Sequence, residues 1–530
     1  MSTTNSAGAP PDTEASTAEH HRVVIVGAGF AGIGAAIELK RRGVDLVVLE
    51  RSTDVGGTWR ENTYPGCRCD VPASLYSLSA VPDTRWSASY PPQSEIQDYI
   101  RHCAETEGIM AHIRWGHVLE EARWVDAEAR YELATSAGPF TADVLVVATG
   151  PMSEPSVPAL PGVERFAGTT FHSARWDHDH PLTGRRVAVI GTGASSIQFV
   201  PQIQPQVAHL DLYQRSAPWI MPHPGRRYGR AERLLYRIVP GAKRAARAGV
   251  YSSRELMVLA FRTRPIMWVG EQISKANLAR YVTDPALRAD LTPRYDMGCK
   301  RVLLSNDFYP AVVRPNVDVV TSGIREIREH SIVTVDGVER EVDTIIWGTG
   351  FHVTDHPVAS LLRGRDGRRL SEVWAETGPR AYLGTTIPGY PNLFVMVGPN
   401  TGLGHSSIVF MMESQINYLL DALRVLDERD AVSFEVTDEA HNAFNADLRD
   451  KFRNTAWASG CASYYQDAHG NNSALWPGFT WTYRQATRHL DLNAHVLRRR
   501  EPGPPPVTAT RPRAVQQAVG VGAGPNETMA

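Results

Sequence analysis

The sequence predicts an α/β protein with two Rossmann-like dinucleotide-binding domains and a helical insertion in the second domain. Two glycine-rich turns, 27–32 and 191–196, carry this prediction. Each turn follows a short apolar strand and precedes a helix and another strand, which is the βαβ pattern of nucleotide-binding folds. A chain of 530 residues is also too long for one ordinary core, so several domains are expected.

Composition excludes several classes of protein. A net charge of −2, with 42% hydrophobic and 21% charged residues, is typical of a globular protein and gives no sign of a nucleic-acid partner. No apolar run reaches about 18 residues, so no membrane span is predicted, and no metal site is expected. Residues 1–20 and 501–530 are expected to be disordered tails. Whether the protein is a monomer or a dimer stays open.

The cysteines show no paired framework. Cys67 and Cys69 form C-x-C instead of the redox motif C-x-x-C, and the others lie far apart in the sequence. We therefore expect reduced thiols and a cytoplasmic protein. The absence of C-x-x-C also argues against a disulfide reductase.

The first turn lies in a complete βαβ unit. Residues 22–26 form the predicted strand, a helix follows over Ala31–Arg42, and the next strand, Val44–Leu49, ends at Glu50. In such a turn the first glycine allows a tight bend, the second lets the backbone approach a pyrophosphate, and the third lets helix and strand pack closely. Glu50 stands 23 residues after Gly27, where an acid binds ribose hydroxyls and repels a 2′-phosphate. This site therefore suits FAD or NAD.

The second turn has the opposite charge at the matching position. Its strand is Arg185–Ile190, its helix runs to about Ile203, and the next strand is His209–Tyr213. Arg215 stands 24 residues after Gly191 and is followed by Ser216. A guanidinium with nearby hydroxyls would bind a 2′-phosphate, so the second cofactor is predicted to be NADPH. The chain would thus bring an electron donor to a bound flavin.

The remaining segments complete the domain order. We expect FAD-domain parts at 21–152 and 341–500, and an NADP domain at 153–340 with a helical insertion at about 225–292. Four insertion helices are predicted, over Ala231–Ile238, Arg254–Phe261, Glu271–Tyr281 and Pro285–Leu291. The strand-like stretches Asp143–Gly150 and Asp343–Gly350 mark the two crossings between domains, and Phe394–Asn400 is a last apolar strand. Ser406–Arg424 reads as an amphipathic helix whose positive N-terminus suits the negative pyrimidine edge of a reduced flavin. The aromatic stretch Gly460–Tyr483 is a mobile lid, a part of the substrate pocket or ordinary packing.

The segment between the two turns, Phe166–Asp177, reads F-x-G-x-x-x-H-x-x-x-W-D. This pattern resembles the fingerprint of the Baeyer–Villiger monooxygenases. The resemblance covers roughly His21 to Leu497 and includes G-G-T-W…Y-P-G…D at residues 56–70, K-R at 300–301 and G-T-G-F at 348–351, all in the family's order. It implies conversion of a ketone to an ester or lactone with FAD, NADPH and O2, through a flavin C4a-peroxide.

The resemblance also implies residue roles. Arg301 would stabilise the flavin peroxide and the ketone adduct, Asp70 would hold that arginine, and Lys300 would bind the NADP phosphate. An arginine suits this task because it cannot lose its charge. The fingerprint residues are Phe166, Gly168, His172, Trp176 and Asp177, and His172 is expected to couple the domains and not to transfer a proton. The residues expected to contact the cofactors are Gly27, Gly29, Phe30, Ala31, Gly32, Glu50, Arg51, Gly57, Thr58, Trp59, Asn62, Tyr64, Asp70, Tyr76, Gly191, Thr192, Gly193, Ala194, Ser195, Ser196, Gln198, Arg215, Ser216, Lys300, Gly350, Asn400 and His405.

Two other functions stay open. One is an N- or S-oxygenating flavin monooxygenase, although that family has Phe or Tyr in place of Trp176 and no fixed acid at Asp177. The other is an NADPH-dependent flavin reductase that does not oxygenate. Ser463-Tyr464-Tyr465 departs from the Ser-Trp-Tyr of many Baeyer–Villiger enzymes, and the turn Gly398–Ser407 lacks the insert of some cyclic-ketone enzymes. This turn and Trp476–Gly478 are closer to the hydroxyacetophenone-type branch.

Overall fold

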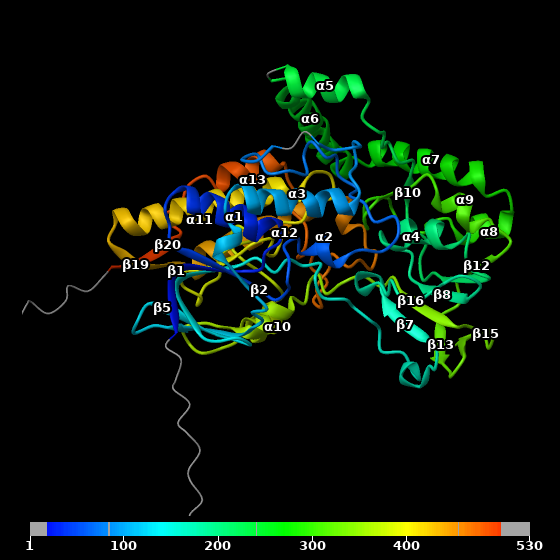
Figure 1. The fold of residues 1–530 in the computed structure, drawn as a ribbon, viewed down its shortest axis with the longest axis horizontal. Helices are drawn as coiled ribbons and strands as arrows, with labels where there is room; N and C mark the ends of the chain where they lie inside the picture. The colour runs from blue at the N-terminus through cyan, green and yellow to red at the C-terminus, as the bar shows by residue number, and fades with distance from the viewer. Residues whose placement is uncertain (1–17, 83–84, 240, 454, 500–530) are drawn as a thin grey trace, which may run out of the picture.

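The computed structural model describes residues 18–82, 85–239, 241–453 and 455–499. In this part of the chain two sheets stand side by side, each with helices packed against it, and a helical arm extends along one side of the molecule (Figure 1). The predicted fold class is confirmed. The tails predicted at 1–20 and 501–530 lie mostly outside the described residues.

The first sheet has the strand order β17-β4-β5-β6-β1-β2-β3, and β18 pairs with β6. Its strands are β1 (Glu19–Val26), β2 (Leu46–Glu50), β3 (Ile113–Trp115), β4 (Leu119–Val125), β5 (Arg130–Thr135), β6 (Phe140–Val147), β17 (Leu362–Arg363) and β18 (Leu393–Val395). Strand β1 is buried on both faces, because Val23 and Ile25 join one apolar cluster while Val24 and Val26 join another. The sheet therefore unites residues 19–147 with residues that return after 362.

Strand β1 begins three residues earlier than predicted. Glu19 pairs with Phe140 and His20 with Thr141, so these two residues belong to the sheet and not to a tail. Their side chains are exposed. The first residues of this strand are polar, so they show no apolar pattern that would predict a strand. They join the sheet through backbone hydrogen bonds, which do not depend on the side chains.

The second sheet is fully parallel, in the order β12-β9-β8-β16-β7. Its strands are β7 (Thr169–His172), β8 (Arg186–Ile190), β9 (His209–Tyr213), β12 (Val317–Val320) and β16 (Thr344–Trp347). The fingerprint segment supplies the edge strand β7, so it is part of the sheet as well as a connection. Smaller sheets are formed by β10 (Ile220–Met221) with β11 (Leu303–Leu304), by β13 (Ile324–Ile327), β14 (Ser331–Thr334) and β15 (Glu339–Glu341), and by β19 (Ala431–Val436) with β20 (His495–Arg499).

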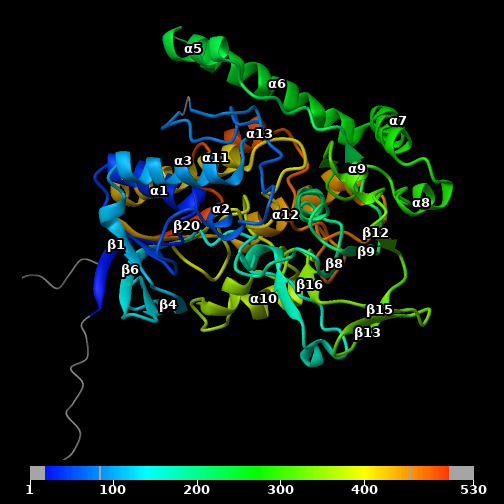
Figure 2. The same ribbon diagram turned by 45° about the vertical axis from the view of Figure 1, so that its right-hand side comes forward.

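The insertion forms the arm, which lies above both sheets (Figures 1 and 2). It comprises α5 (Arg230–Ile238), α6 (Ala242–Arg262), α7 (Arg264–Tyr281) and α8 (Pro285–Asp290). Helices α6 and α7 start 12 and 7 residues earlier than predicted. For α6 the reason is that the stretch before Arg254 is basic and alanine-rich and has no apolar periodicity. Among the described helices, none is both long enough and apolar enough to cross a membrane.

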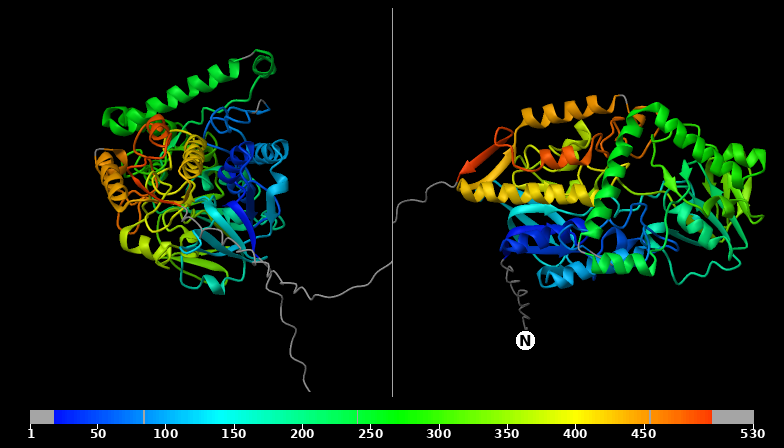
Figure 3. Two further views of the ribbon diagram at one scale, coloured as in Figure 1. Left: turned by 90° about the vertical axis from the view of Figure 1, so that its left-hand side faces the viewer. Right: turned by 90° about the horizontal axis from the view of Figure 1, so that it is seen from above.

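After β18, the described chain packs on the first nucleotide fold through a long helix. Helix α11 (Ile408–Glu428) starts at the cap Ser407, whose hydroxyl accepts a hydrogen bond from the Val409 amide at 3.3 Å. It packs against α1 (Phe30–Arg41), where a methyl group on Gly34 would lie 3.1 Å from Ile416. Seen from above, α11 and α12 run along the first sheet and α6 crosses over the molecule (Figure 3). The other helices are α2 (Thr58–Glu61), α3 (Gln93–Thr106), α4 (Ser196–Ile203), α9 (Phe308–Val312), α10 (Leu370–Thr377), α12 (Asp438–Phe452) and α13 (Thr480–Ala486).

Candidate active site

The two glycine turns are built in the same way. Gly27 has φ +106°, and a methyl group on it would lie 2.7 Å from the Ala148 carbonyl oxygen. Gly191 has φ +107°, and a methyl group there would lie 2.5 Å from the Gly348 carbonyl oxygen. Only glycine fits either position. The strand ends predicted as crossings therefore pass directly beside the two turns.

The helices that follow the turns can receive phosphate groups. Gly29 is the N-cap residue of α1 and Ser195 is that of α4, and neither helix start has a capping hydrogen bond from a side chain. Their first amides have no acceptor within the helix and carry the positive end of the helix dipole. Gly29 also faces Gly57, where a methyl group would lie 3.1 Å from the Gly29 Cα. Backbone approach without side chains is what a bound pyrophosphate requires, so both turns fit a dinucleotide.

Glu50 is buried at the end of β2. Its carboxylate accepts hydrogen bonds from the amides of Ala28, at 2.7 Å, and Ser52, at 2.9 Å. These bonds tie the glycine turn to the strand end. Each carboxylate oxygen has a further lone pair, so the ribose contact stays a prediction that the geometry allows.

The flat side chains after the first turn divide into two groups. Trp59 donates to the Tyr76 hydroxyl at 3.1 Å, and the Tyr76 ring meets Phe30 edge-on at 5.2 Å, so these three form one aromatic cluster beside α1. Tyr64 instead donates to the Gln198 amide oxygen at 3.1 Å. Gln198 lies on α4, so this bond joins the first nucleotide fold to the second.

Other predicted cofactor residues near the crossing make local bonds. Asn62 donates to the Thr58 carbonyl at 2.9 Å, and Arg51 forms an ion pair with Glu154. Gly350 has φ +83° and open space where a side chain would stand. These contacts shape the segment beside the turn, and direct cofactor contact stays a prediction for them.

The fingerprint residues pack between the two folds. The Trp176 ring lies 5.2 Å from Phe171 of β7 and 5.2 Å from Phe199 of α4. Arg175 donates to Glu61 of α2 at 2.6 Å. Asp177 accepts from the amides of Asp179 and His180, which closes a turn. A methyl group on Gly168 would lie 2.4 Å from the Asp343 carbonyl oxygen and 2.6 Å from the Phe166 ring.

His172 is buried in this junction. Its Nδ1 accepts a hydrogen bond from the Ala174 amide at 3.0 Å, and its ring lies 5.6 Å from Phe351. Burial lowers the pKa of His172 to about 4, so the ring is neutral at physiological pH. A neutral, enclosed imidazole fits a structural coupling role better than proton transfer.

Lys300 and Arg301 are neighbours in sequence, yet their side chains reach different nucleotide folds. Lys300 Nζ donates to the Ser216 hydroxyl at 2.8 Å. Arg301 Nε and Nη2 both lie 2.6 Å from Asp70 Oδ2. One short segment thus places one cation at the second fold and another at the first.

The Arg301–Asp70 pair is the charged centre of the site. About a quarter of each side chain is exposed, and Arg301 Nη1 also donates to the Leu403 carbonyl at 3.4 Å. Burial alone would raise the pKa of Asp70, but the charge and hydrogen bonds of Arg301 hold it below its usual range. The negative charge of Asp70 likewise raises the pKa of Arg301 well above its ordinary value. Both groups therefore stay charged through the physiological range.

Replacement of Asp70 by asparagine is expected to lower the free energy of unfolding by about 1–3 kcal/mol at pH 6–8, since it leaves Arg301 unpaired in a partly exposed site. A carboxyl whose folded pKa is depressed stabilises the protein above its unfolded pKa, about 3.9, and loses that contribution as the pH falls through the folded pKa. The difference from wild type should therefore be constant from pH 8 to 5 and shrink below about pH 4. Urea unfolding across this range measures it.

The matched control is Asp98→Asn, because Asp98 is 71% exposed and pairs with Arg101 on the surface. It should change the unfolding free energy by no more than about 0.5 kcal/mol. An Asp70→Asn effect equal to this control at pH 7 would contradict the assigned ion pair.

The second fold has its own basic cluster. Lys300 bonds to Ser216, and its ammonium also lies 4.7 Å from the centre of the Tyr295 ring. Burial and the nearby charge of Arg215 lower the pKa of Lys300. The basic cluster therefore consists of Arg215, Ser216 and Lys300, although Ser216 and Lys300 are 84 residues apart in the sequence. Two cations and a hydroxyl at this position fit a 2′-phosphate.

The C-terminal aromatic stretch has two kinds of member. Trp476 and Tyr483 are buried and satisfied, by the Phe479 and Leu383 carbonyls, so they are packing residues. The ring centres of Tyr464 and Tyr465 instead lie 4.4 Å apart. Burial raises the pKa of both tyrosines, and the positive charge of Arg301 offsets part of that rise. Tyr465 also joins an apolar cluster with Phe261 of α6 and with Trp457, whose rings stack at 4.9 Å. This pair is the part of the stretch that borders the site.

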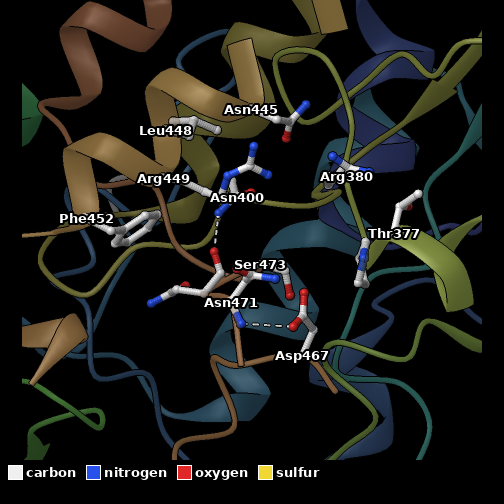
Figure 4. A pocket seen from close by; sticks show the side chains of 12 residues that line it. Thr377, Arg380, Asn400, Asn445, Leu448, Arg449, Phe452, Asp467, Asn471 and Ser473 are labelled. Atoms are coloured by element: carbon white, nitrogen blue, oxygen red, sulfur yellow. Dashed lines mark hydrogen bonds between the residues drawn. The ribbon is translucent and has the colours of Figure 1, made fainter. Parts of the chain in front are cut away.

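Two predicted cofactor residues, Asn400 and His405, are buried near the C-terminal loop and α6. Asn400 lies in the wall of a pocket beside α12 and the C-terminal loop (Figure 4), and its amide donates to the carbonyls of Asn472, at 2.7 Å, and Leu475, at 3.0 Å. It braces that loop. His405 is fully buried just before α11, with its Nε2 3.7 Å from the Glu255 carboxylate. Cofactor contact stays a prediction for both residues.

The structure corrects the expectation that no cysteines are paired. Cys299 and Cys461 form a disulfide across 162 residues, and the other three cysteines are buried and free. The bond ties the residue before Lys300 and Arg301 to the loop that carries Tyr464 and Tyr465. Sequence spacing could not reveal it, because neither cysteine belongs to a local motif.

Replacement of Cys461 by serine is expected to lower the free energy of unfolding by about 2–4 kcal/mol. Non-reducing peptide mapping of the wild type should find residues 299 and 461 in one cross-linked peptide. Reductant should destabilise the wild type to the same degree as the substitution, while leaving Cys461→Ser unchanged. Free thiols at both Cys299 and Cys461, giving five free thiols in place of three in protein purified without reductant, would contradict the bond.

Sequence reasoning missed two residues of the site. Arg254 donates to the Tyr90 hydroxyl at 2.5 Å, and its charge also helps to lower the pKa of Asp70. Glu255 is buried, accepts from the Thr480 amide at 2.9 Å and hydroxyl at 2.7 Å, and is kept ionised by His405 and Thr480 against the effect of burial on its pKa. Both lie on α6, where no motif marks them.

Comparison with known proteins agrees with this geometry. A family model described as pyridine nucleotide-disulphide oxidoreductase matches residues 24–228, which include both glycine turns. The chain is 48% identical over 490 residues to a Baeyer–Villiger monooxygenase of Streptomyces coelicolor, covering 91% of this chain and 94% of the relative. It is 43% identical over 509 residues to a Baeyer–Villiger monooxygenase of Pseudomonas aeruginosa, covering 95% of each.

Solved structures show the same fold over most of the chain. An oxidised steroid monooxygenase bound to NADP superposes with a TM-score of 0.79 at 30% identity, covering 90% of this chain and 99% of that one. A closed form of cyclohexanone monooxygenase superposes with a TM-score of 0.83 at 25% identity, covering 91% and 100%. One crystal form of OTEMO in complex with FAD and NADP superposes with a TM-score of 0.80 at 25% identity, covering 90% of this chain and 99% of that one. Another form gives a TM-score of 0.81 at 25% identity, covering 91% and 100%. The chain belongs to the Baeyer–Villiger monooxygenase family.

Proposed function

We propose that this protein is an FAD- and NADPH-dependent Baeyer–Villiger monooxygenase. The overall reaction converts a ketone, O2, NADPH and a proton into an ester or lactone, NADP+ and water. Among the described residues, the observation that carries the proposal is the divergence of Lys300 and Arg301 toward the two nucleotide folds. An enzyme that transfers electrons between two dinucleotides needs residues that contact both nucleotide folds, and this pair supplies one cation to each fold.

The first fold is assigned to FAD and the second to NADPH. Glu50 at the end of β2 disfavours a 2′-phosphate, while Arg215, Ser216 and Lys300 favour one. When bound, FAD would supply the redox chemistry, by accepting electrons from NADPH and activating O2. The residues of the chain bind and orient the two cofactors.

Arg301 is assigned as the catalytic cation. Oxygen insertion beside a ketone builds negative charge on the oxidant and on the carbonyl oxygen, and a fixed cation in a partly closed site stabilises both. A guanidinium keeps its charge at every working pH. Asp70 is assigned as the positioning residue, because its carboxylate holds two nitrogens of Arg301.

We infer that the pocket is formed where Arg301 meets Tyr464 and Tyr465, with Phe261 and Trp457 behind them. This aromatic wall, together with the short turn before α11, favours aryl ketones, as in the hydroxyacetophenone-type branch.

The test is a panel of aryl, cyclic and linear ketones plus an aryl sulfide, incubated with purified protein, NADPH and air. We expect at least one ketone, with aryl ketones first, to gain one oxygen atom as an ester or lactone. A sulfoxide without any ester would favour the heteroatom oxygenase. Rapid NADPH oxidation that yields only hydrogen peroxide across the panel would favour the reductase.

A further inference from the structure

The helical arm carries an unusual share of the exposed apolar surface. We call residues 226–273 the basic arm, which includes α5, α6 and the first half of α7. It holds eleven of the 21 large hydrophobic side chains that are exposed in the described chain. They are Leu234, Leu235, Ile238, Val239, Leu256, Met257, Leu259, Ile266, Trp268, Val269 and Ile273. Single exposed apolar residues need no explanation, but such a concentration marks an interaction surface.

These side chains gather at the two ends of α6. One group lies on α5 and just after it, and the other surrounds the corner between α6 and α7. Ile266, Val269 and Ile273 follow the helical spacing i, i+3 and i+7, so they form one exposed stripe of α7. Helix α6 has 21 residues and spans about 30 Å, so it separates the two groups by about that distance. Figure 2 shows the arm lying along the outside of the molecule.

The same segment is strongly basic. It contains eleven of the 55 Lys and Arg residues but three of the 57 Asp and Glu residues, a net charge of +8, and the rest of the chain therefore carries −10. Arg227, Arg230, Arg233, Arg244 and Arg262 are exposed. Some other cations of the arm are engaged: Arg226 pairs with Glu232, and Arg247 and Arg254 contact Ser77 and Tyr90. The exposed arginines thus stand beside the exposed apolar groups.

We propose that the basic arm binds the surface of an anionic lipid bilayer. Basic side chains attract acidic headgroups, while aliphatic and indole side chains enter the boundary between headgroups and acyl chains. Trp268, which is 60% exposed on the α7 corner, suits that boundary because an indole has an apolar body and a polar N–H. The arm would hold the enzyme at the membrane surface, which is where apolar ketones concentrate.

Charge favours this occupant over a second copy of the chain. A twofold dimer through the arm would place one +8 surface against another, and like charges facing each other are repulsive. Apolar anchors at two sites about 30 Å apart, with arginines near both, also match an extended flat surface better than a single peptide groove. A bilayer supplies both the charge and the extent.

Co-sedimentation with vesicles tests the proposal. Holoenzyme is mixed with vesicles of phosphatidylcholine alone, or of phosphatidylcholine with 30% phosphatidylglycerol, at about 0.05 and 0.5 M NaCl, where the Debye length falls from about 14 to 4 Å. We expect binding to the anionic vesicles at low salt, at least tenfold weaker binding to the neutral vesicles, and strong loss of binding at high salt.

Two variants separate the parts of the surface. Arg230→Glu with Arg233→Glu should weaken anionic binding by more than about 25-fold, since each lost basic charge contributes about fivefold. Ile266→Ser with Trp268→Ser and Val269→Ser should weaken binding to the anionic vesicles at low salt, because it removes the apolar anchor and leaves the basic charges in place. The controls are Arg165→Glu with Arg325→Glu and Val335→Ser with Val338→Ser, which change exposed residues outside the arm and should bind as wild type does.

All variants should keep their flavin content and their rate with a water-soluble ketone, so failure of membrane binding is distinguishable from failure of the proposed reaction. Equal binding to neutral vesicles, or no binding to any vesicle, would overturn the proposal. Self-association that the Ile266, Trp268 and Val269 substitutions abolish would also overturn it, and would assign the surface to a second copy.

Discussion

Replacement of Arg301 by alanine is expected to lower ester formation by about 10²–10³-fold while NADPH still reduces the bound flavin. The loss follows from removal of the cation beside the reacting oxygen atoms, an effect of the size seen when one donor to a developing oxyanion is deleted. NADPH oxidation should continue and yield hydrogen peroxide, so the ratio of ester to NADPH consumed falls. Gas chromatography of the product and stopped-flow absorbance of the flavin measure the two steps separately.

Arg301→Lys is the matched variant because it keeps the charge but loses the second nitrogen that binds Asp70. We expect it to recover part of the ester yield. Arg325→Ala, which removes a half-exposed surface arginine, should leave both steps unchanged. Ester formation at the wild-type rate in Arg301→Ala would remove Arg301 from the reaction.

Replacement of Arg215 by alanine is expected to raise the KM for NADPH by about 10–100-fold, while the KM for NADH changes little. The guanidinium is assigned to the 2′-phosphate, which NADH lacks, and one charged hydrogen-bonded contact contributes about 1.5–3 kcal/mol. The ratio of kcat/KM for NADPH to that for NADH, measured by flavin reduction, reports the change.

Arg215→Lys serves as the control and should keep most of the preference for NADPH. Lys300→Ala should act in the same direction as Arg215→Ala, because Lys300 bonds to Ser216 in the same cluster. An equal rise in the KM for both nucleotides would show that Arg215 holds the fold of the turn instead of the phosphate.

Local patterns allowed much of the fold to be predicted. The strand His209–Tyr213 has the predicted bounds, and α1 and β8 lie within one residue of theirs, because glycine turns and apolar runs specify these elements within a few residues. The contrast between Glu50 and Arg215 was also readable, since each follows its own turn at nearly the same distance. The pairing of β7 with β16 in the second sheet could not be predicted, because it depends on backbone groups that are far apart in the sequence.

Most of the site could not be predicted from local patterns, because it depends on contacts between residues that are far apart in the sequence. Arg301 and Asp70 are 231 residues apart, and only the resemblance to a family suggested that they meet. No sequence motif marked the Cys299–Cys461 bond, the contact of Arg254 with Tyr90 or the contact of Glu255 with Thr480. Each of these contacts joins residues that are far apart in the sequence.

The most direct test of the proposed reaction is the origin of the inserted oxygen atom. The protein is incubated with NADPH, an aryl ketone and ¹⁸O2 in ordinary water, and the ester is analysed by mass spectrometry. We expect an ester that is two mass units heavier than the ester formed in ordinary O2, with one NADPH consumed per ester. An unlabelled ester, or NADPH consumption with no oxygenated product from any ketone, would contradict the proposed reaction.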